Sequence, residues 1–276
     1  MILRGFQVYR VHQLRNYPLL PQRLFGHAQN NSLKQGLKTL KSYGDDWKKS
    51  LSMLKKLEQE EGGAPITAYH TTMNTCARSG KHIEICELIN QMSSQGMIQT
   101  TETYKIAIVA CTKARQWRSS LGLLNKMIQN NGTPDVVCFN STISACGKGG
   151  QWEKAFEVFD LMMKTHGIKP TVITFSALIS ACGNGGQWEK AFEVFDSMMK
   201  THGIKPNIIT FNALISAYEK GGQWGKAMEL LITAQSVGCY SKVWRSDRKI
   251  DLHDCPAAVA RTVLRVFLYE LRSGFR

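Results

Sequence analysis

The sequence predicts an all-α protein, a solenoid of stacked helical hairpins that ends in a short strand–helix tail. Two observations carry this prediction. Residues 136–171 and 172–207 are consecutive 36-residue segments that differ at only eight positions. The same register continues, with decaying similarity, into 101–135 and 66–100 upstream and into 208–241 downstream. A fixed period of this size is typical of stacked-repeat architectures.

Each repeat unit begins with one helical pattern. In the first of the two near-copies, Phe139, Ile143 and Cys146 recur at four- and three-residue intervals, which is typical of one helix face. Gly149 and Gly150 follow this pattern. Glycine readily adopts the left-handed conformation of a helix cap, so we expect both residues to end the first helix.

A second helical pattern begins near Trp152. Its apolar stripe consists of Ala155, Phe156, Phe159 and Met163. Asp160 and Lys164 lie on the solvated side and form a favourable i,i+4 pair. Gly167 and Pro170 end this helix, because proline lacks the amide donor and disfavours helical geometry in the residue before it.

A single hairpin of this size cannot bury its apolar stripe, but stacked neighbours bury a continuous core and leave a long concave face. Tryptophan recurs at one register position in four units, as Trp117, Trp152, Trp188 and Trp224. The tryptophan, phenylalanine and methionine stripes lie on the buried side at helical intervals. We therefore interpret them as packing residues.

The repeated pattern xVTFNALISA-x-x-K-G-G-x-W-E-K-A-x-E-x-F-x-x-M, closed by G-I-K-P-[T/N], resembles a pentatricopeptide repeat with one extra residue in the MMKTHG segment. The tetratricopeptide repeat differs, because its tryptophan lies early in the first helix. The resemblance covers 66–241, and 31–65 fits as a degenerate first unit. It implies a right-handed α-solenoid and sequence-selective binding of single-stranded RNA, which would guide RNA processing, stability or translation in an organelle.

The resemblance also implies which residues contact a base. In the family, the fifth and last residues of a unit face the base edge, and the second packs on the base. Here the base-edge residues are Asn140, Thr171, Ser176, Asn207 and Asn212. The base-packing residues are Val137, Ile173 and Ile209. Both base-edge positions are among the eight that differ between the near-copies. By the family code, the units read pyrimidine–adenine–pyrimidine from 5′ to 3′.

An alternative interpretation is that Asn140, Ser176 and Asn212 are helix-start residues that satisfy free backbone amides. The upstream units are weaker readers. They combine His70 with Thr100 and Lys105 with Asp135, and Lys105 could instead contact a phosphate. Because the units are few, we expect modest affinity or assistance from other RNA-processing proteins.

The formal net charge of +14 suggests a polyanionic partner. Its distribution is uneven, since the first 44 residues hold seven basic residues and no acidic one. Lysines within the repeats, such as Lys148, Lys169 and Lys205, are therefore better evidence for RNA than the total charge. Residues 1–30 have the character of a targeting arm for a mitochondrion or plastid. A disordered basic arm is the alternative.

Cysteine recurs at one register position, as Cys76, Cys111, Cys146 and Cys182. Stacked helices place such equivalents about 10 Å apart, too far for a disulfide, and the chain has no C-x-x-C pair. We interpret these residues as small core side chains and expect no metal, cofactor or small-molecule substrate. No apolar stretch has the length of a membrane span, so we expect no membrane contact.

The segment 242–276 resembles the opening of the small MutS-related (Smr) domain. Ile250-Asp251-Leu252-His253 matches the end of that domain's first strand, although Asp254 stands where glycine is expected. Asp251 and His253 would be the catalytic candidates of an endonuclease. With only part of the domain present, we expect no enzymatic activity and interpret the segment as a cap on the solenoid. A protein-binding scaffold is a third possible function.

Overall fold

The computed structural model describes residues 31–59, 63–240, 244–246, 249–250, 252 and 255–273. The predicted targeting arm at 1–30 lies outside the described residues, as do Asp251 and His253. The chain divides into two compact units, Met1–Thr75 and Cys76–Arg276.

The first unit contains α1 (Asn31–Ser42), α2 (Trp47–Gln59) and most of α3 (Ile66–Arg78). The second unit continues with α4 (His82–Ser94), α5 (Thr101–Lys113), α6 (Trp117–Gln129), α7 (Val136–Lys148), α8 (Trp152–Asp160), η2 (Leu161–Thr165), α9 (Val172–Asn184), α10 (Trp188–Lys200), α11 (Ile208–Lys220), α12 (Trp224–Ser236), β1 (Trp244–Ser246), β2 (Lys249–Ile250) and α13 (Ala257–Ser273). The helical-repeat fold class is therefore confirmed. β1 and β2 form a short antiparallel pair between α12 and α13.

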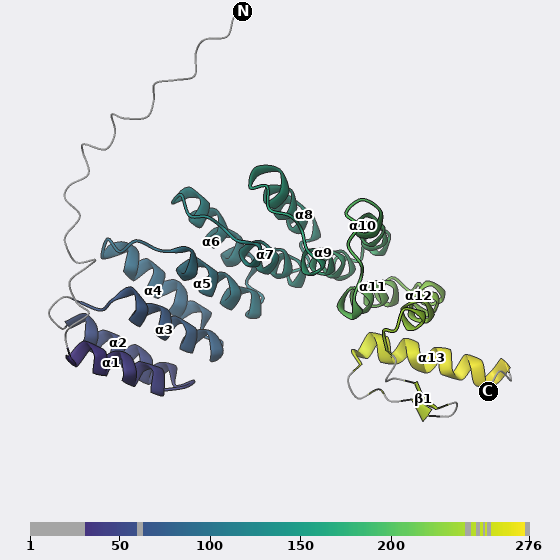
Figure 1. Cartoon of the computed structure of the whole chain (residues 1–276), viewed down its shortest axis with the longest axis horizontal. Coiled ribbons are helices and arrows are strands. Elements are labelled where there is room, and N and C mark those ends of the chain that lie inside the picture. The colour runs from purple at the N-terminus through teal and green to yellow at the C-terminus, as the bar shows by residue number, and fades with distance from the viewer. Residues whose placement is uncertain are drawn as a thin grey trace, which may run out of the picture. The chain divides into compact units, whose positions relative to one another are not determined.

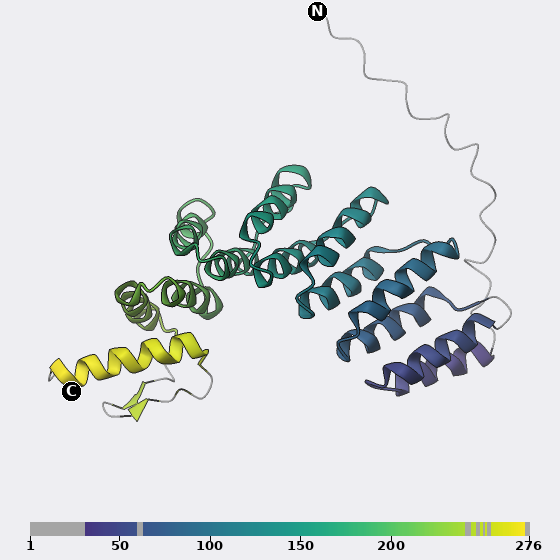
Figure 2. The same cartoon turned by 180° about the vertical axis from the view of Figure 1, so that it is seen from behind.

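Within the second unit, the first helices of successive repeats form one row (Figures 1 and 2). α5 packs on α7, α7 on α9, and α9 on α11. The second helices α6, α8 and α10 each pack against the first helix of their own hairpin and that of the next. A continuous core results, as expected for nearest-neighbour stacking.

The two glycines at the end of each first helix have different roles. Gly150 has a φ of +72° and makes the left-handed turn, as predicted. Gly149 has a φ of −87°, so the expected left-handed conformation is wrong for this residue. Its role is steric, because a Cβ there would overlap the Trp117 ring. The same contact recurs between Gly185 and Trp152 and between Gly221 and Trp188. These contacts confirm the predicted packing role of Trp117, Trp152 and Trp188, whereas the prediction is wrong for Trp224, which is 40% exposed.

Small residues also set the approach of successive first helices. A Cβ on Gly147 would lie 2.8 Å from the Ala181 Cα and Cβ, and one on Gly183 would lie 2.8 Å from the Ala217 Cβ. A side chain at either glycine would push the neighbouring helix away. These glycines therefore fix the distance between one groove-lining helix and the next.

The extra residue of the 36-residue units is absorbed where the second helix ends. In the first near-copy, α8 passes into the π-helical turn η2, and the His166 N–H donates to the Leu161 carbonyl at 3.2 Å. In the second, the His202 N–H donates to the Ser197 carbonyl at 3.2 Å. A single-turn π-bulge adds a residue without disturbing the rest of the helix.

The four register-matched cysteines, Cys76, Cys111, Cys146 and Cys182, are all fully buried and unbridged. Burial raises the pKa of Cys146 to about 11 and that of Cys182 to about 12. Their thiols therefore stay protonated at neutral pH, which confirms the predicted core role. Among the described residues, no helix is both long and apolar enough to cross a bilayer.

Candidate nucleic-acid interface

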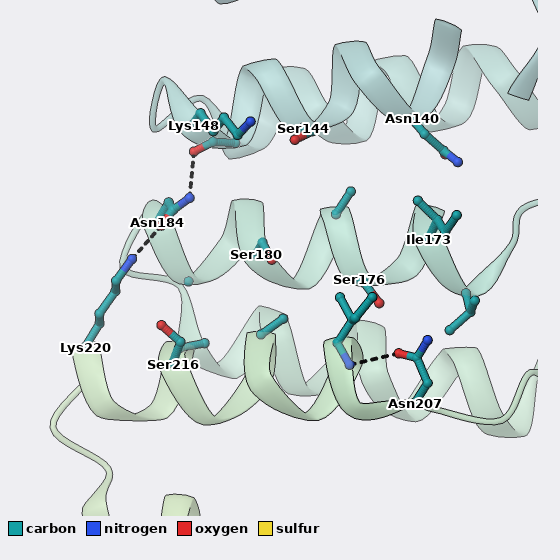
Figure 3. A pocket seen from close by; sticks show the side chains of 17 residues that line it. Asn140, Ser144, Lys148, Ile173, Ser176, Ser180, Asn184, Asn207, Ser216 and Lys220 are labelled. Carbon is teal, nitrogen blue, oxygen red and sulfur yellow. Dashed lines mark hydrogen bonds between the residues drawn. The ribbon is translucent and has the colours of Figure 1, made fainter. Parts of the chain in front are cut away.

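A groove of about 440 Å³ runs across the exposed sides of α7, α9 and α11 (Figure 3). It is lined at one end by the first turns of these helices and at the other by their last residues. Of the predicted site residues, the groove brings together Asn140, Ile173, Ser176, Asn207 and Ile209. The sequence did not indicate the serines in its middle, Ser144, Ser180 and Ser216.

Large aliphatic side chains are exposed in the first turn of each of the three helices. The exposed fraction is 41% for Val137, 61% for Ile173 and 58% for Ile209. Single exposed apolar residues are ordinary on protein surfaces, but these recur at one register position. Covering them with an apolar or aromatic surface would remove water-exposed apolar area, as the predicted base-packing role requires.

Asn207 is the N-cap of α11. Its Oδ1 accepts hydrogen bonds from the Ile209 N–H at 3.0 Å, the Thr210 N–H at 3.1 Å and the Thr210 hydroxyl at 3.1 Å. These bonds fix the orientation of the amide, since only its oxygen can accept them. The Asn207 Nδ2 therefore points into the groove as a donor (Figure 3).

Ser176 is only 5% exposed, and its hydroxyl oxygen lies 2.9 Å from that of Thr210. Thr210 thus joins Ser176 to Asn207, so the two predicted base-edge residues of this unit come together through a residue that the sequence did not indicate. The hydroxyl at the third position of the helix was the available signal, since Thr103 and Thr174 match it. Asn207 supplies the more exposed polar group, and Ser176 is largely covered.

The preceding level is arranged differently. The Asn140 Oδ1 is buried and has no hydrogen-bond partner among the residues that the structure describes. The Thr171 N–H donates to the Thr174 hydroxyl at 3.0 Å, at the start of α9. A buried acceptor without a partner carries a desolvation penalty, which a donor from a ligand would relieve.

Asn212 lies outside this groove. Its Oδ1 accepts a hydrogen bond from the hydroxyl of Tyr240, a buried residue that follows α12. Burial raises the pKa of Tyr240, so the hydroxyl remains a donor. Tyr240 therefore occupies the Asn212 oxygen in this structure, and the reading role of Asn212 stays a prediction.

The capping alternative is wrong for Asn140, Ser176 and Asn212, because each lies at the fifth position of its helix. The last residue of the preceding unit is the N-cap instead. These N-cap residues are Thr100, Asp135, Thr171 and Asn207. The predicted last-position reader therefore also starts a helix.

In one of the two weaker upstream pairs, Lys105 and Asp135 form an ion pair with each other. Lys105 Nζ lies 3.2 Å from the Asp135 carboxylate and 3.6 Å from that of Glu102. The Asp135 carboxylate also accepts the Cys138 N–H at 2.9 Å. Partial burial raises the pKa of Asp135, but the bonds from Cys138 and Lys105 outweigh it and hold that pKa below its usual value. Lys105 is therefore already paired with two carboxylates, and its role at a phosphate stays a prediction.

The other weak pair falls in two different units. His70 lies in α3 within the first compact unit, whereas Thr100 precedes α5 in the second. The Thr100 hydroxyl accepts the Thr103 N–H at 3.4 Å, so it caps α5. The structure gives no joint geometry for this pair, and its reading role stays a prediction.

Polar and basic side chains line the other end of the groove, where the first helices end (Figure 3). Lys220 Nζ donates to Asn184 Oδ1, and Asn184 Nδ2 donates to the Gly147 carbonyl at 3.1 Å. Lys148 Nζ lies 3.5 Å from the Thr112 carbonyl. Each side chain thus reaches back to the preceding first helix. The predicted Lys169 and Lys205 are exposed but do not line the groove.

These features define an α-helical repeat protein whose first helices line a polar groove. The PPR repeat family model matches residues 134–184 and 170–220, and the PPR repeat model matches 67–97, 102–132 and 209–239. Together the matches cover more than half of the chain. The chain belongs to the pentatricopeptide repeat family.

Solved structures show the same fold. The pentatricopeptide repeat protein PPR10 from maize is 22% identical, with a TM-score of 0.66 over 89% of this chain and 34% of that one. PPR10 in complex with an 18-nt psaJ RNA element is 21% identical, with a TM-score of 0.59 over 89% of this chain and 35% of that one. The PPR domain of Arabidopsis thaliana protein-only RNase P 1, in complex with tRNA, is 16% identical. Its TM-score is 0.53 over 70% of this chain and 93% of that one. The chain thus spans about a third of the maize protein. No curated protein matches the sequence.

Proposed function

We propose that this chain binds single-stranded RNA along the groove of α7, α9 and α11, with one base at each repeat. The observation that carries the proposal is the groove lining, in which exposed aliphatic residues lie together with polar side chains. Ile173 and Asn207 form the clearest such combination. An unstacked base needs both, an apolar surface for its face and hydrogen-bonding groups for its edge.

The polar groups at the two groove levels differ. The Asn207 amide presents a donor, which suits a ring-nitrogen acceptor of adenine. At the preceding level Asn140 turns its nitrogen toward the groove, while its Oδ1 is buried (Figure 3). The Asn207 donor supports adenine as the middle base of the proposed order pyrimidine–adenine–pyrimidine, and the two pyrimidines, at Asn140 and Asn212, follow from the family code.

The neighbouring structures support an RNA ligand for this fold. PPR10 has been solved with an 18-nt psaJ RNA element, and the Arabidopsis PPR domain with tRNA. The lysines at the groove edge, Lys148 and Lys220, support it further, because cations near a phosphate backbone add salt-dependent affinity.

The test is a binding titration with short RNAs that carry a central adenine between two pyrimidines. We expect affinity to fall about tenfold when that adenine is changed, since one well-formed base contact contributes about 1–3 kcal/mol of discrimination. A second arm uses an RNA with both pyrimidines replaced. Equal affinity for all sequences would reject base reading, and no affinity for any of them would reject the proposal.

The cellular role proposed with this activity is guidance of RNA processing, stability or translation in a mitochondrion or plastid, with chemistry supplied by partner proteins. The basic composition of residues 1–30 supports this proposed localisation. Fusing these residues to a fluorescent protein tests it. Diffuse fluorescence outside both organelles would count against an organellar role.

The Ile250-Asp251-Leu252-His253 sequence favours a second candidate, an endonuclease that uses an Smr-like tail. Incubating the chain with labelled RNA and Mg²⁺ tests this function. Cleavage that disappears in an Asp251→Asn, His253→Ala double variant would support it. If the RNA stays intact, the endonuclease function is rejected and RNA binding remains as the proposed function.

A further inference from the structure

The last helix of the chain docks as though it were the first helix of another repeat. α13 packs on both α11 and α12, just as α11 packs on α9 and α10 (Figures 1 and 2). The buried side of α13 consists of Val259, Thr262, Val263 and Val266. The row of packed first helices therefore continues for one more level.

The contact between α11 and α13 replaces a small-residue contact with an ion pair. Glu219 stands at the helix position that Gly147 and Gly183 occupy in the repeats. Its side chain is only 2% exposed, and it accepts hydrogen bonds from Arg261 Nη2 at 2.6 Å and Nε at 3.1 Å. The Arg261 side chain remains 57% exposed. Such a buried carboxylate requires α13 as its partner.

Arg265 continues the row at the groove edge. In the repeats, Lys148 and Asn184 reach back to the carbonyls of Thr112 and Gly147. Arg265 reaches back to the equivalent residue of α11, with Nη1 3.8 Å from the Glu219 carboxylate. Its guanidinium carbon also lies 3.5 Å from the centroid of the ring of Trp224, the first residue of α12, in a cation–π contact.

This level differs from the others in having no base reader. If Arg265 is counted as the thirteenth residue of a first helix, like Lys148, then the fifth position is Ala257, which cannot hydrogen-bond a base edge. Arg261 and Arg265 share the single carboxylate of Glu219, so one of their two positive charges is not matched by it. Lys220 adds a third cation on α11, and it donates to the uncharged Asn184 side chain. A guanidinium presents a planar fork of donors that matches phosphate oxygens.

We infer that α13 forms a non-reading end level of the groove, where Arg265 and Arg261 bind a backbone phosphate of the RNA. The inference rests on the proposed RNA-binding function and adds a ligand group to it. With the 5′ to 3′ order given above, this phosphate is the one that follows the last base read.

The experiment uses three RNAs that end at the third base: one without a terminal phosphate, one with a 3′-phosphate and one with a 5′-phosphate. The intact chain should bind the 3′-phosphorylated RNA about tenfold more tightly than the unmodified one, and the 5′-phosphorylated RNA with little gain. Arg265→Gln should abolish this gain and keep the preference for the central adenine. Lys190→Gln, which removes the same charge from α10, should leave the gain intact.

The outcomes separate the inference from the function on which it rests. If the 3′-phosphate adds nothing, or if Arg265→Gln keeps the gain, the end level is overturned while adenine selectivity still supports RNA reading. Equal gains from both phosphates would indicate general attraction and also overturn it. Arg265→Lys covers the case in which Arg265→Gln unfolds, since it keeps the charge without the fork and should show a reduced gain.

Discussion

The two 36-residue near-copies fold into the same hairpin but line the groove differently. Of their eight differences, the pair Leu161 and Ser197 lies on a second helix, and the other seven lie on α7 and α9 or at the last position of the unit. Two of the differences lie in the core, Cys138 against Thr174 and Thr142 against Leu178, whereas the glycine–alanine contacts between successive first helices are unchanged. The comparison teaches that the stacking contacts are kept while several groove and core residues change.

The polar chemistry of the two copies also differs. At the fifth helix position the first copy has Asn140, whose Oδ1 is buried without a partner among the described residues, and the second has Ser176, whose hydroxyl lies 2.9 Å from that of Thr210. Nearly the same backbone thus carries different polar groups at neighbouring levels. We expect a difference in base preference from this contrast.

The largest effect is expected from the shared scaffold. Gly147→Ala and Gly183→Ala each place a Cβ within 2.8 Å of the next first helix, so each should destabilise the protein by about 1–3 kcal/mol through overpacking. Because both copies share this contact, the two losses should be similar. Denaturant unfolding measures them.

Gly122→Ala is the matched control. Gly122 lies in α6 with open space around its Cβ position, so alanine there should be neutral or stabilise by up to about 1 kcal/mol. An unchanged unfolding midpoint in Gly183→Ala would show that the first helices are not held at this distance.

A smaller effect is expected at the exposed aliphatic row. Ile173→Ala and Ile209→Ala should each weaken RNA binding about fivefold, since each removes roughly 1 kcal/mol of apolar contact with a base. Stability should change by less than about 0.5 kcal/mol, because both side chains are exposed in the free protein. Fluorescence anisotropy and thermal unfolding measure the two quantities.

Ile83→Ala in α4 provides the control, since Ile83 is also 60% exposed but lies on a second helix. It should leave RNA affinity unchanged. Equal weakening by all three substitutions would show that the groove row has no special role.

The smallest effect is expected at the closed upstream pair. Asp135→Asn keeps an N-cap side chain but removes the ion pair with Lys105, so stability at pH 7 should fall by at most about 1 kcal/mol. The pKa of Asp135 is depressed in the folded protein. Its stabilising contribution is therefore present above the ordinary value of 3.8 and is lost as the pH falls through the folded pKa.

Acid unfolding of the two proteins measures this contribution. The stability difference between wild type and Asp135→Asn should shrink as the pH falls below about 4. A difference that persists at the lowest pH would mean that the charge of Asp135 is not its source.

Much of the fold could be predicted from sequence because its determinants are local or periodic. The helical intervals of Phe139 and Ile143, the break at Gly150 and the repeat period together indicate stacked hairpins. The steric role of Gly149 could not be predicted in the same way. It depends on the ring of Trp117 from the preceding unit, whose position follows only from the stacking.

The candidate site was harder to predict because its hydrogen bonds join distant residues. The sequence register indicated Asn207 and Ser176, but the link through Thr210 depends on how closely α9 and α11 approach. The pairing of Asn212 with Tyr240 has the same origin, since 28 residues separate the two.

The central claim is that the polar residues at each level select the base, and exchanging them between the near-copies tests it most directly. Ser176→Asn with Asn207→Thr gives the second copy the polar pair of the first, and Thr210 matches Thr174 beside it. We predict that the middle base preference moves from adenine to pyrimidine by about tenfold, with unchanged thermal stability. An adenine preference that survives the exchange in a folded protein would contradict the account.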